Sequence, residues 1–398
     1  MIFFCENPDN TRHSIAASRV SLVLIRRCRA NKIHIKDAFV FPQSCRFSGD
    51  LDESQQSEDE PCPRPHENIS NLYVCRISAY FTFGLMSLKA ITILPGAVKG
   101  NLTANASKSM MQRVVAASTL CDQKVTIHNP GQSHDCKAAL EIARKLGAEI
   151  ISGDPLSIEP RKGQIPRRVS CGESGLGIRM FTPILSLQNQ SITIDGEGSL
   201  KTRPMGFFEE VLPQLGVSVE SNNQKVPITI HGPLQGGDFE LDGSLTSQFL
   251  TGLLMALPCA ESSSTIRVKN LRSKGYVELT LQVLSSFGVI IDHENWEVFH
   301  VPGNQSYQSN AITIEGDWSG AAFLLVAGAI AGEVSLSSLV VNSFQPDKAI
   351  LSALISSGAR LKVGDIVSTF KSELEAFSFD ATDCPGCACR KLRWQINN

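Results

Sequence analysis

The sequence predicts an α/β protein assembled from strand–helix units that repeat about every 70 residues. Glycines at 147, 216, 288 and 358 are separated by 69, 72 and 70 residues. Each glycine follows a stretch with helical apolar periodicity, such as "ALEIARKLG", and precedes a short strand pattern, such as "AEII". Glycine in such a place can adopt the left-handed backbone conformation that ends a helix. Strands and helices are therefore expected to alternate along the middle of the chain.

The composition is that of a globular protein with a sizeable core. Of 398 residues, 42% are hydrophobic and 19% are charged, and the formal net charge is −2. This charge predicts no nucleic-acid partner, because nucleic-acid binders usually carry a broad basic field. No run of 18 apolar residues occurs, so no membrane span is expected. Few cysteines lie in the long middle part of the chain, which favours a reducing compartment. The cysteines of "CPGCAC" near the end have no second cluster in range that would complete a metal site.

The two ends of the chain differ from this middle. Residues 1–85 join a basic stretch to the acidic, proline-broken "LDESQQSEDEPCPRPHE", and we expect a disordered or spurious extension. After Pro385 the composition changes abruptly, since residues 386–398 combine clustered cysteines, a basic run and a lone tryptophan. A fifth glycine would be expected about 70 residues after Gly358. We therefore expect 386–398 to be an aberrant tail from a truncated or shifted reading frame.

Five short stretches combine small residues with a cation or a hydroxyl. In "NASKSMMQR" a helix that begins near Ser107 would present its free N–H groups, Lys108 and Arg113 to an anion. The alternative is an ordinary capped helix whose lysine and arginine are solvated. "CGESGLGIRM" and "GEGSLKTRP" place glycines near Arg179 and Arg203, which suit a carboxylate or phosphate, although each alone is also typical of an exposed turn. "DGSLTSQFL" and "LRSKGYVEL" place hydroxyl groups at helix starts, where plain N-caps are the alternative.

Taken in this order, the stretches resemble the 5-enolpyruvylshikimate-3-phosphate synthase family over roughly residues 86–385. "LPG…SKSMMQR" is similar to the family's opening "LPGSKS…NR", "GESGLGIR" to its glycine loop, and "KTRPMG" to its "ERPIG" turn. "DGSLTSQFLTGLLMALP" is a close match to the family's "GS-x-SSQFL-x-ALLM" helix. The resemblance implies a two-lobed enolpyruvyl-transferase fold, with a complete second lobe at 99–313 and an incomplete first lobe made of 86–98 and 314–385.

The resemblance also implies a reaction of the shikimate pathway to aromatic amino acids. The enolpyruvyl group of phosphoenolpyruvate moves to the 5-hydroxyl of shikimate 3-phosphate, and phosphate is released, without a metal or redox cofactor. Both substrates are anions, so the site should be rich in lysine and arginine. A cytoplasmic monomer is implied as well.

Carried over residue by residue, the resemblance implies that Lys108 contacts both substrates. Phosphoenolpyruvate would be bound by Gly175, Arg179 and Arg203. Shikimate 3-phosphate would be bound by Ser109, Arg113, Thr246, Ser247, Gln248, Ser273 and Tyr276. Glu173 departs from the asparagine that the family often has in its glycine loop, and an added carboxylate beside an anion site is unexpected. Gly386 stands where the family has its catalytic aspartate, so impaired turnover is expected.

Two alternatives stay open. UDP-N-acetylglucosamine enolpyruvyl transferase shares the implied fold and phosphoenolpyruvate, but it typically opens with Ala-Lys-Asn and uses a cysteine in a mobile glycine-rich loop. Here Ser-Lys-Ser and "TSQF" favour shikimate 3-phosphate. The second alternative is a non-catalytic remnant that only binds substrates, and Gly386 favours it.

Overall fold

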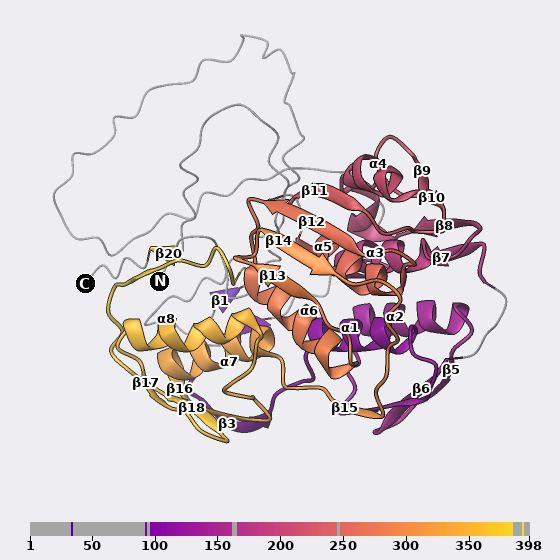
Figure 1. Cartoon of the computed structure of the whole chain (residues 1–398). Helices are drawn as coiled ribbons and strands as arrows, with labels where there is room; N and C mark the ends of the chain where they lie inside the picture. The colour runs from indigo at the N-terminus through magenta and orange to yellow at the C-terminus, as the bar shows by residue number, and fades with distance from the viewer. Residues whose placement is uncertain are drawn as a thin grey trace, which may run out of the picture. The chain divides into compact units, whose positions relative to one another are not determined.

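The computed structural model describes residues 96–160, 165–244 and 247–384 with their side chains (Figure 1). It also describes the backbone of β1 (Ile33–His34), paired with β2 (Thr92–Ile93), and of β20 (Leu392–Arg393), paired with β19 (Ser378–Phe379). The described residues from Gly96 to Cys384 belong to one compact unit. The predicted extension at 1–85, the predicted ligand Thr246 and the predicted tail at 386–398 lie outside the described residues, except for the short strands β1 and β20.

Four four-stranded sheets in the described residues share one arrangement. Each begins with a parallel pair and continues with two antiparallel strands. In spatial order, the first two sheets are β15 (Ala311–Thr313), β4 (Val125–His128), β6 (Leu156–Glu159), β5 (Glu149–Ile151), and β7 (Arg168–Ser170), β8 (Ser191–Asp195), β10 (Ile228–His231), β9 (Ser218–Ser221). The other two are β11 (Asp238–Asp242), β12 (Ser264–Lys269), β14 (Val298–Val301), β13 (Asp292–Glu294), and β3 (Val98–Thr103), β16 (Gly332–Ser337), β18 (Val367–Phe370), β17 (Arg360–Lys362).

Helices alternate with these strands in a constant order. One helix precedes the second strand of each sheet: α1 (Lys108–Ser118), α3 (Gly175–Leu185), α5 (Ser247–Ala256) and α7 (Trp318–Ala331). Another precedes each antiparallel hairpin: α2 (His134–Lys145), α4 (Phe207–Val211), α6 (Lys274–Ser286) and α8 (Ile350–Ser356). Short 3₁₀ turns are η1 (Gly198–Thr202), η2 (Leu212–Leu215), η3 (Leu257–Cys259) and η4 (Pro346–Ala349). The predicted α/β class is confirmed, and none of the described helices is long and apolar enough to cross a bilayer.

The four repeat glycines have the backbone conformation that the sequence predicts. Their φ angles are 96°, 79°, 76° and 75° at Gly147, Gly216, Gly288 and Gly358. Each lies just after a helix, and the next element in every case is the edge strand of a sheet: β5, β9, β13 or β17. The 70-residue spacing therefore marks the same turn in four equivalent units.

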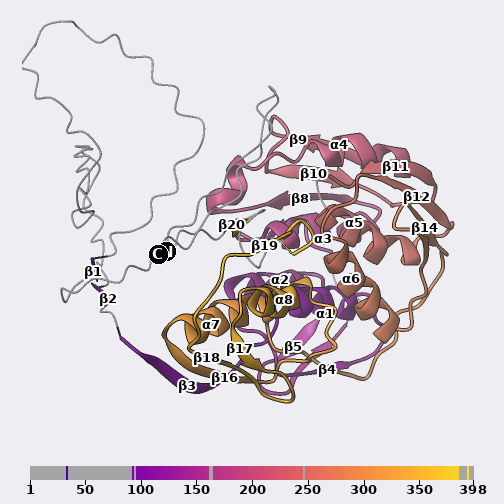
Figure 2. The same ribbon diagram turned by 90° about the vertical axis from the view of Figure 1, so that its left-hand side faces the viewer.

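Two of the four units exchange their first strands. Strand β3 leads directly into α1, yet it pairs in parallel with β16 over Val98–Thr103 and Gly332–Ser337. Strand β15 leads directly into α7, yet it pairs in parallel with β4. Figures 1 and 2 both show β3 beside β16, far along the sequence from it. The chain therefore passes from one set of sheets to the other twice, after β3 and after β15.

The two crossing segments, 104–107 and 314–317, lie against each other. The N–H of Ser107 donates to the carbonyl of Glu315 at 2.8 Å, and the N–H of Asp317 donates to the carbonyl of Asn105 at 2.7 Å. An antiparallel bridge joins Ala106 to Gly316 between these bonds. The starts of α1 and α7 are therefore held side by side.

The buried hydrophobic residues form two clusters that follow this crossing. The larger contains residues between Met110 and Ile314, and the smaller contains Ala104 and residues between Trp318 and Cys384. The predicted boundary at 98/99 differs from the observed strand, because β3 extends to Thr103 and all its residues pair with β16. Exposed Lys99, Asn101 and Thr103 alternate with Val98, Gly100 and Leu102 along this strand, but a glycine and an exposed leucine give the alternation only a weak apolar side.

The left-handed turns make a testable contribution to stability. Gly288→Ala is expected to lower the free energy of unfolding by about 1 kcal/mol, because a side chain at φ 76° is strained although no atom lies within 4 Å of the added Cβ. Gly364 also has no atom within 4 Å of an added Cβ, and its φ is outside the left-handed region. Gly364→Ala is the matched control and should be neutral in urea unfolding. Equal stabilities of the two variants would contradict the role of the turn.

Candidate substrate-binding site

The predicted site residues stand mainly at the N-terminal turns of α1, α3, α5 and α6. The Ser107 hydroxyl caps α1 by accepting from the N–H of Met110 at 3.3 Å, and the Ser174 hydroxyl caps α3 by accepting from the N–H of Gly177 at 2.9 Å. None of the four helices has an Asp or Glu in its first turn. The positive end of each helix dipole is therefore not balanced from within its own first turn, which favours a bound anion.

Side-chain hydrogen bonds join the starts of three of these helices. The Ser174 hydroxyl donates to Gln112 Oε1 at 2.7 Å, which ties α3 to α1. Arg179 Nη1 donates to Gln248 Oε1 at 3.3 Å, which ties α3 to α5. Gln112 and Ser174 are buried and were not among the predicted residues. No motif singles out a buried Gln–Ser pair, because the two residues lie 62 positions apart.

Arg113 is buried and bound to protein groups. Its Nε donates to the Thr280 hydroxyl at 2.9 Å, its Nη1 to the Ser109 carbonyl at 2.7 Å and its Nη2 to the Tyr276 carbonyl at 3.2 Å. Burial lowers the pKa of Arg113 to about 10, so the guanidinium stays charged at neutral pH. Predicted residues Ser109, Arg113 and Tyr276 are thus brought together by one side chain that joins α1 to α6.

Arg179 and Arg203 form a pair of like charges beside Gly175. A Cβ added to Gly175 would overlap Arg203 Nη1 and come within 3.1 Å of Arg179 Nη1. Burial and the charge of Arg203 together lower the pKa of Arg179 to about 10. Within the described residues neither guanidinium forms an ion pair with a carboxylate, and the buried Arg179 Nε has no hydrogen-bond partner. Two adjacent cations without a counter-ion favour a bound anion.

The carboxylate of Glu173 is directed at the start of η1. Its Oε2 accepts from the N–H of Ser199 at 3.4 Å, and a Cβ added to Gly198 would overlap the carboxyl group. Gly198, with φ 51°, leaves room for this approach. Glu173, which the sequence makes unexpected in this loop, therefore contacts one backbone N–H at the start of the turn that precedes Arg203.

Lys108 makes an ion pair at the edge of the site. Its Nζ lies 3.0 Å from Asp135 Oδ2 in the first turn of α2, and the lysine side chain is half exposed. Lys108 also lies close enough to Asp317, the N-cap of α7, to oppose the rise that burial causes in the pKa of that carboxyl. The lysine is thus placed between the starts of α1, α2 and α7.

Three predicted hydroxyl groups are available to a ligand. Ser109, Ser247 and Ser273 make no side-chain hydrogen bond to another described residue. Ser273 stands at the start of α6 with φ 56°, a strained angle for a residue other than glycine. Thr246 cannot be placed, because it lies outside the described residues.

Tyr276 contacts a residue that the sequence did not reveal. Its hydroxyl donates to Asp347 Oδ2 at 2.7 Å, and the hydroxyl of Ser319 donates to the same oxygen. Asp347 lies in η4 and is buried. A single aspartate in "NSFQPDKAI" carries no motif, because an acidic residue after a proline is ordinary at a helix start.

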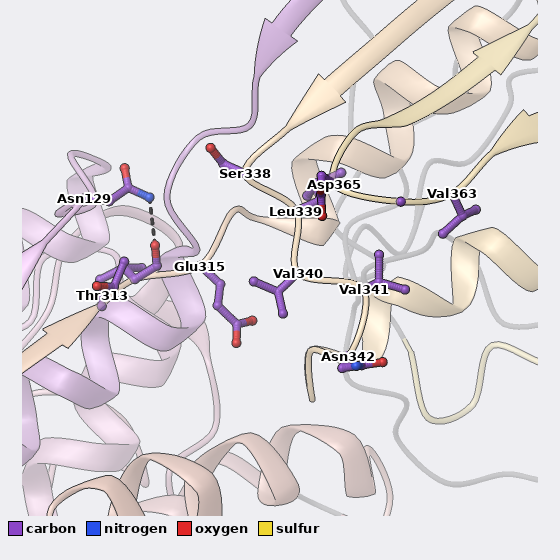
Figure 3. A pocket seen from close by; sticks show the side chains of 12 residues that line it. Asn129, Thr313, Glu315, Ser338, Leu339, Val340, Val341, Asn342, Val363 and Asp365 are labelled. Atoms are coloured by element: carbon purple, nitrogen blue, oxygen red, sulfur yellow. Dashed lines mark hydrogen bonds between the residues drawn. The ribbon is translucent and has the colours of Figure 1, made fainter.

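A separate hollow lies at the crossing segments (Figure 3). It is lined by Asn129, Thr313, Ile314, Glu315, 338–342 and 363–365. The Glu315 carboxylate there accepts from Ser343 Oγ at 2.5 Å and from Gln345 Nε2 at 3.1 Å. Its lining residues include two carboxylates and no lysine or arginine, so this hollow does not suit an anionic ligand.

Known proteins match most of the chain. The family model described as EPSP synthase (3-phosphoshikimate 1-carboxyvinyltransferase) matches residues 94–385. A 3-phosphoshikimate 1-carboxyvinyltransferase of Clostridium novyi (strain NT) is 32% identical over 315 residues, which are 75% of this chain and 72% of the relative. One from Clostridium botulinum (strain Alaska E43 / Type E3) is 35% identical over 304 residues, with coverage of 74% and 70%.

Solved structures agree at the level of the fold. The EPSP synthase of Acinetobacter baumannii superposes with a TM-score of 0.61 at 21% identity, covering 74% of this chain and 70% of that one. The enolpyruvyl transferase NikO of Streptomyces tendae superposes with a TM-score of 0.58 at 16% identity, covering 72% and 69%. The repeated units, the cationic helix starts and the matched family model lead to one conclusion: the chain belongs to the EPSP synthase family.

Proposed function

We propose that the chain binds shikimate 3-phosphate and phosphoenolpyruvate at the gathered helix starts, as an enzyme of the enolpyruvyl transfer after which its family is named. The observation that carries this proposal is the pair of guanidinium groups, Arg179 and Arg203, held beside Gly175 without a carboxylate partner in the described residues. Phosphoenolpyruvate carries a phosphate and a carboxylate, and arginine binds both groups through paired N–H donors.

The α3 side of the site suits phosphoenolpyruvate. Arg179 and Arg203 would bind its charges, while Gly175 leaves the space that a side chain would take from Arg203. The free energy of two adjacent cations falls when an anion separates them. Glu173 does not oppose this, because its carboxylate contacts the N–H of Ser199.

The α1, α5 and α6 side suits shikimate 3-phosphate. The hydroxyls of Ser109, Ser247 and Ser273 have no partner among the described residues, and a ring that bears hydroxyls and a phosphate needs neutral donors and acceptors. Lys108, half exposed and paired with Asp135, supplies a positive charge between the two sides. Thr246, Gln248, Arg113 and Tyr276 complete this proposed subsite.

Two alternatives were left open by the sequence: a UDP-N-acetylglucosamine enolpyruvyl transferase and a remnant that binds substrates without turnover. The relatives reported above are named for 3-phosphoshikimate, and none of them is named for a UDP-sugar, so the shikimate substrate is favoured. A chain that binds without turnover is tested by measuring phosphate release with both substrates. Gly386, at the position of the family's catalytic aspartate, lies outside the described residues. The experiments below therefore measure substrate binding. The monomeric state and cytoplasmic location stay predictions.

A titration of the whole chain with shikimate 3-phosphate tests the proposed function directly. Calorimetry should detect saturable heat, and phosphoenolpyruvate should bind the chain that is already saturated with shikimate 3-phosphate. Absence of heat at millimolar ligand, from a chain that melts cooperatively, would sink the proposal.

Gly175→Ala should weaken phosphoenolpyruvate binding by roughly tenfold or more, because the added Cβ displaces Arg203 and removes a charged hydrogen bond. Shikimate 3-phosphate affinity should change less than about twofold, since its proposed ligands lie on other helices. Gly100→Ala is the control, because no atom lies within 4 Å of its added Cβ. Unchanged phosphoenolpyruvate affinity in Gly175→Ala would show that Arg203 does not bind this substrate.

Lys108→Ala should weaken both substrates, whereas Ser273→Ala should weaken only shikimate 3-phosphate. Loss of the lysine removes a charged hydrogen bond to each anion, worth roughly 1.5–3 kcal/mol, and loss of the serine removes one neutral bond on one side. Asp135→Asn is the matched control, since it frees Lys108 from its ion pair without removing the lysine. Calorimetric affinities that fall equally for both substrates in both variants would contradict this division.

A further inference from the structure

Asp347 is a buried carboxylate that joins two parts of the fold. It lies in η4, is 2% exposed, and belongs to the part of the chain whose core surrounds the fourth sheet. Its Oδ2 accepts hydrogen bonds from Tyr276 of α6 and from Ser319 in the first turn of α7. Tyr276 packs against the other core. One carboxylate oxygen therefore connects the start of α6 with the start of α7.

The backbone near this carboxylate is packed closely. A Cβ added to Gly275 would lie 2.7 Å from Pro346 Cβ, so α6 and η4 approach each other at a position without a side chain. Asp347 follows Pro346 directly, and Tyr276 follows Gly275 directly. The distance between the two partners is thus set by contact of the main chains and not by long flexible side chains.

Tyr276 is held at both ends. Burial and the charge of Asp347 raise the pKa of its hydroxyl well above the usual value, so the phenol remains a proton donor toward the carboxylate. At the other end, its carbonyl accepts from Arg113 Nη2 and from the Thr280 hydroxyl. The guanidinium of Arg113 also lies 5.9 Å from the centre of the tyrosine ring. The ring therefore has little freedom to turn.

We propose that Asp347 is a positioning residue that fixes Tyr276, and through it the start of α6, in the shikimate 3-phosphate subsite. This inference rests on the proposed function, because it assigns Asp347 to a subsite that the function requires. Asp347 itself touches no substrate; it acts by holding the phenol where the ring of shikimate 3-phosphate packs. Ser319 shares the carboxylate oxygen and orients it toward Tyr276.

A double-mutant cycle on the whole chain tests the proposal, with shikimate 3-phosphate affinity measured by calorimetry. Asp347→Ala should weaken binding by roughly tenfold or more, because a hydrogen bond to a charged group is lost. In a Tyr276→Phe background, the same substitution should weaken binding by less than about twofold, because the hydroxyl through which Asp347 acts is already absent. A general loss of folding would instead weaken binding equally in both backgrounds.

Glu315→Ala is the matched control. Glu315 is also a carboxylate that accepts two hydrogen bonds near η4, from Ser343 and Gln345, but it does not contact Tyr276. Its removal should leave shikimate 3-phosphate affinity within about twofold of the unchanged chain. A loss as large as that of Asp347→Ala would overturn the proposal, since it would indicate general loosening of this region.

Asp347→Asn keeps the test decisive if the alanine variant does not fold. The amide oxygen can still accept from Tyr276 and Ser319, so binding should weaken less than in Asp347→Ala, and the loss should again vanish in Tyr276→Phe. Additive losses across the cycle would overturn the role of Asp347 while leaving the proposed function intact. No heat from the folded, unsubstituted chain would overturn the proposed function itself.

Discussion

The antiparallel contact between segments 104–107 and 314–317 is the constraint on which the rest of the structure depends. Because β3 and β15 pair in each other's sheets, the chain must cross twice, and the two crossings hydrogen-bond to each other through Ser107, Glu315, Asn105 and Asp317. Ser107 and Asp317 are also the N-caps of α1 and α7. One set of backbone bonds therefore fixes the starts of both helices. This places Lys108 and Ser109 on one side, and Ser319 with its partner Asp347 on the other, around the start of α6.

The positive charges of Arg113 and Arg179 are held in two different surroundings. Arg113 is fully buried, and three neutral oxygens, from Thr280, Ser109 and Tyr276, satisfy one N–H on each of its nitrogens. Neutral acceptors leave the positive charge of the guanidinium uncancelled, so its field still reaches a ligand. Arg179 lies instead beside Arg203, where each positive charge raises the free energy of the other. The folded chain thus holds adjacent cations whose electrostatic cost a bound anion would relieve, which is the form of preorganisation that the proposed anion recognition needs.

The features that the sequence predicted correctly, the glycine turns and the helix starts, each depend on a short stretch of chain. The glycines at the repeat spacing mark turns whose φ angles depend on a single residue, and the helix starts depend on short motifs, so both are readable without an alignment. The exchange of β3 and β15 is not readable, because pairing between residues more than 180 positions apart leaves no pattern in "VKGNLT" or "AIT". For the same reason Gln112, Ser174 and Asp347 were missed, since each is defined by a partner far away in the chain. Glu173 looked unsuited to its loop only because its partner, the N–H of Ser199, belongs to the next turn.

Lys108 and Arg113 stand five residues apart on one helix, yet their surroundings give them opposite properties. The Lys108–Asp135 pair is half exposed, and such pairs contribute only about 0–1 kcal/mol, so a phosphate can replace Asp135 at little cost. Arg113 cannot move in this way, because leaving its three acceptors would strand buried polar groups at about 1–3 kcal/mol each. In the proposed function, a lysine that can change partners would contact two substrates in turn, whereas an arginine that joins α1 to α6 would only define where one of them lies. The division of the site into a movable and a fixed cation therefore follows from burial, since the charges of the two side chains are the same.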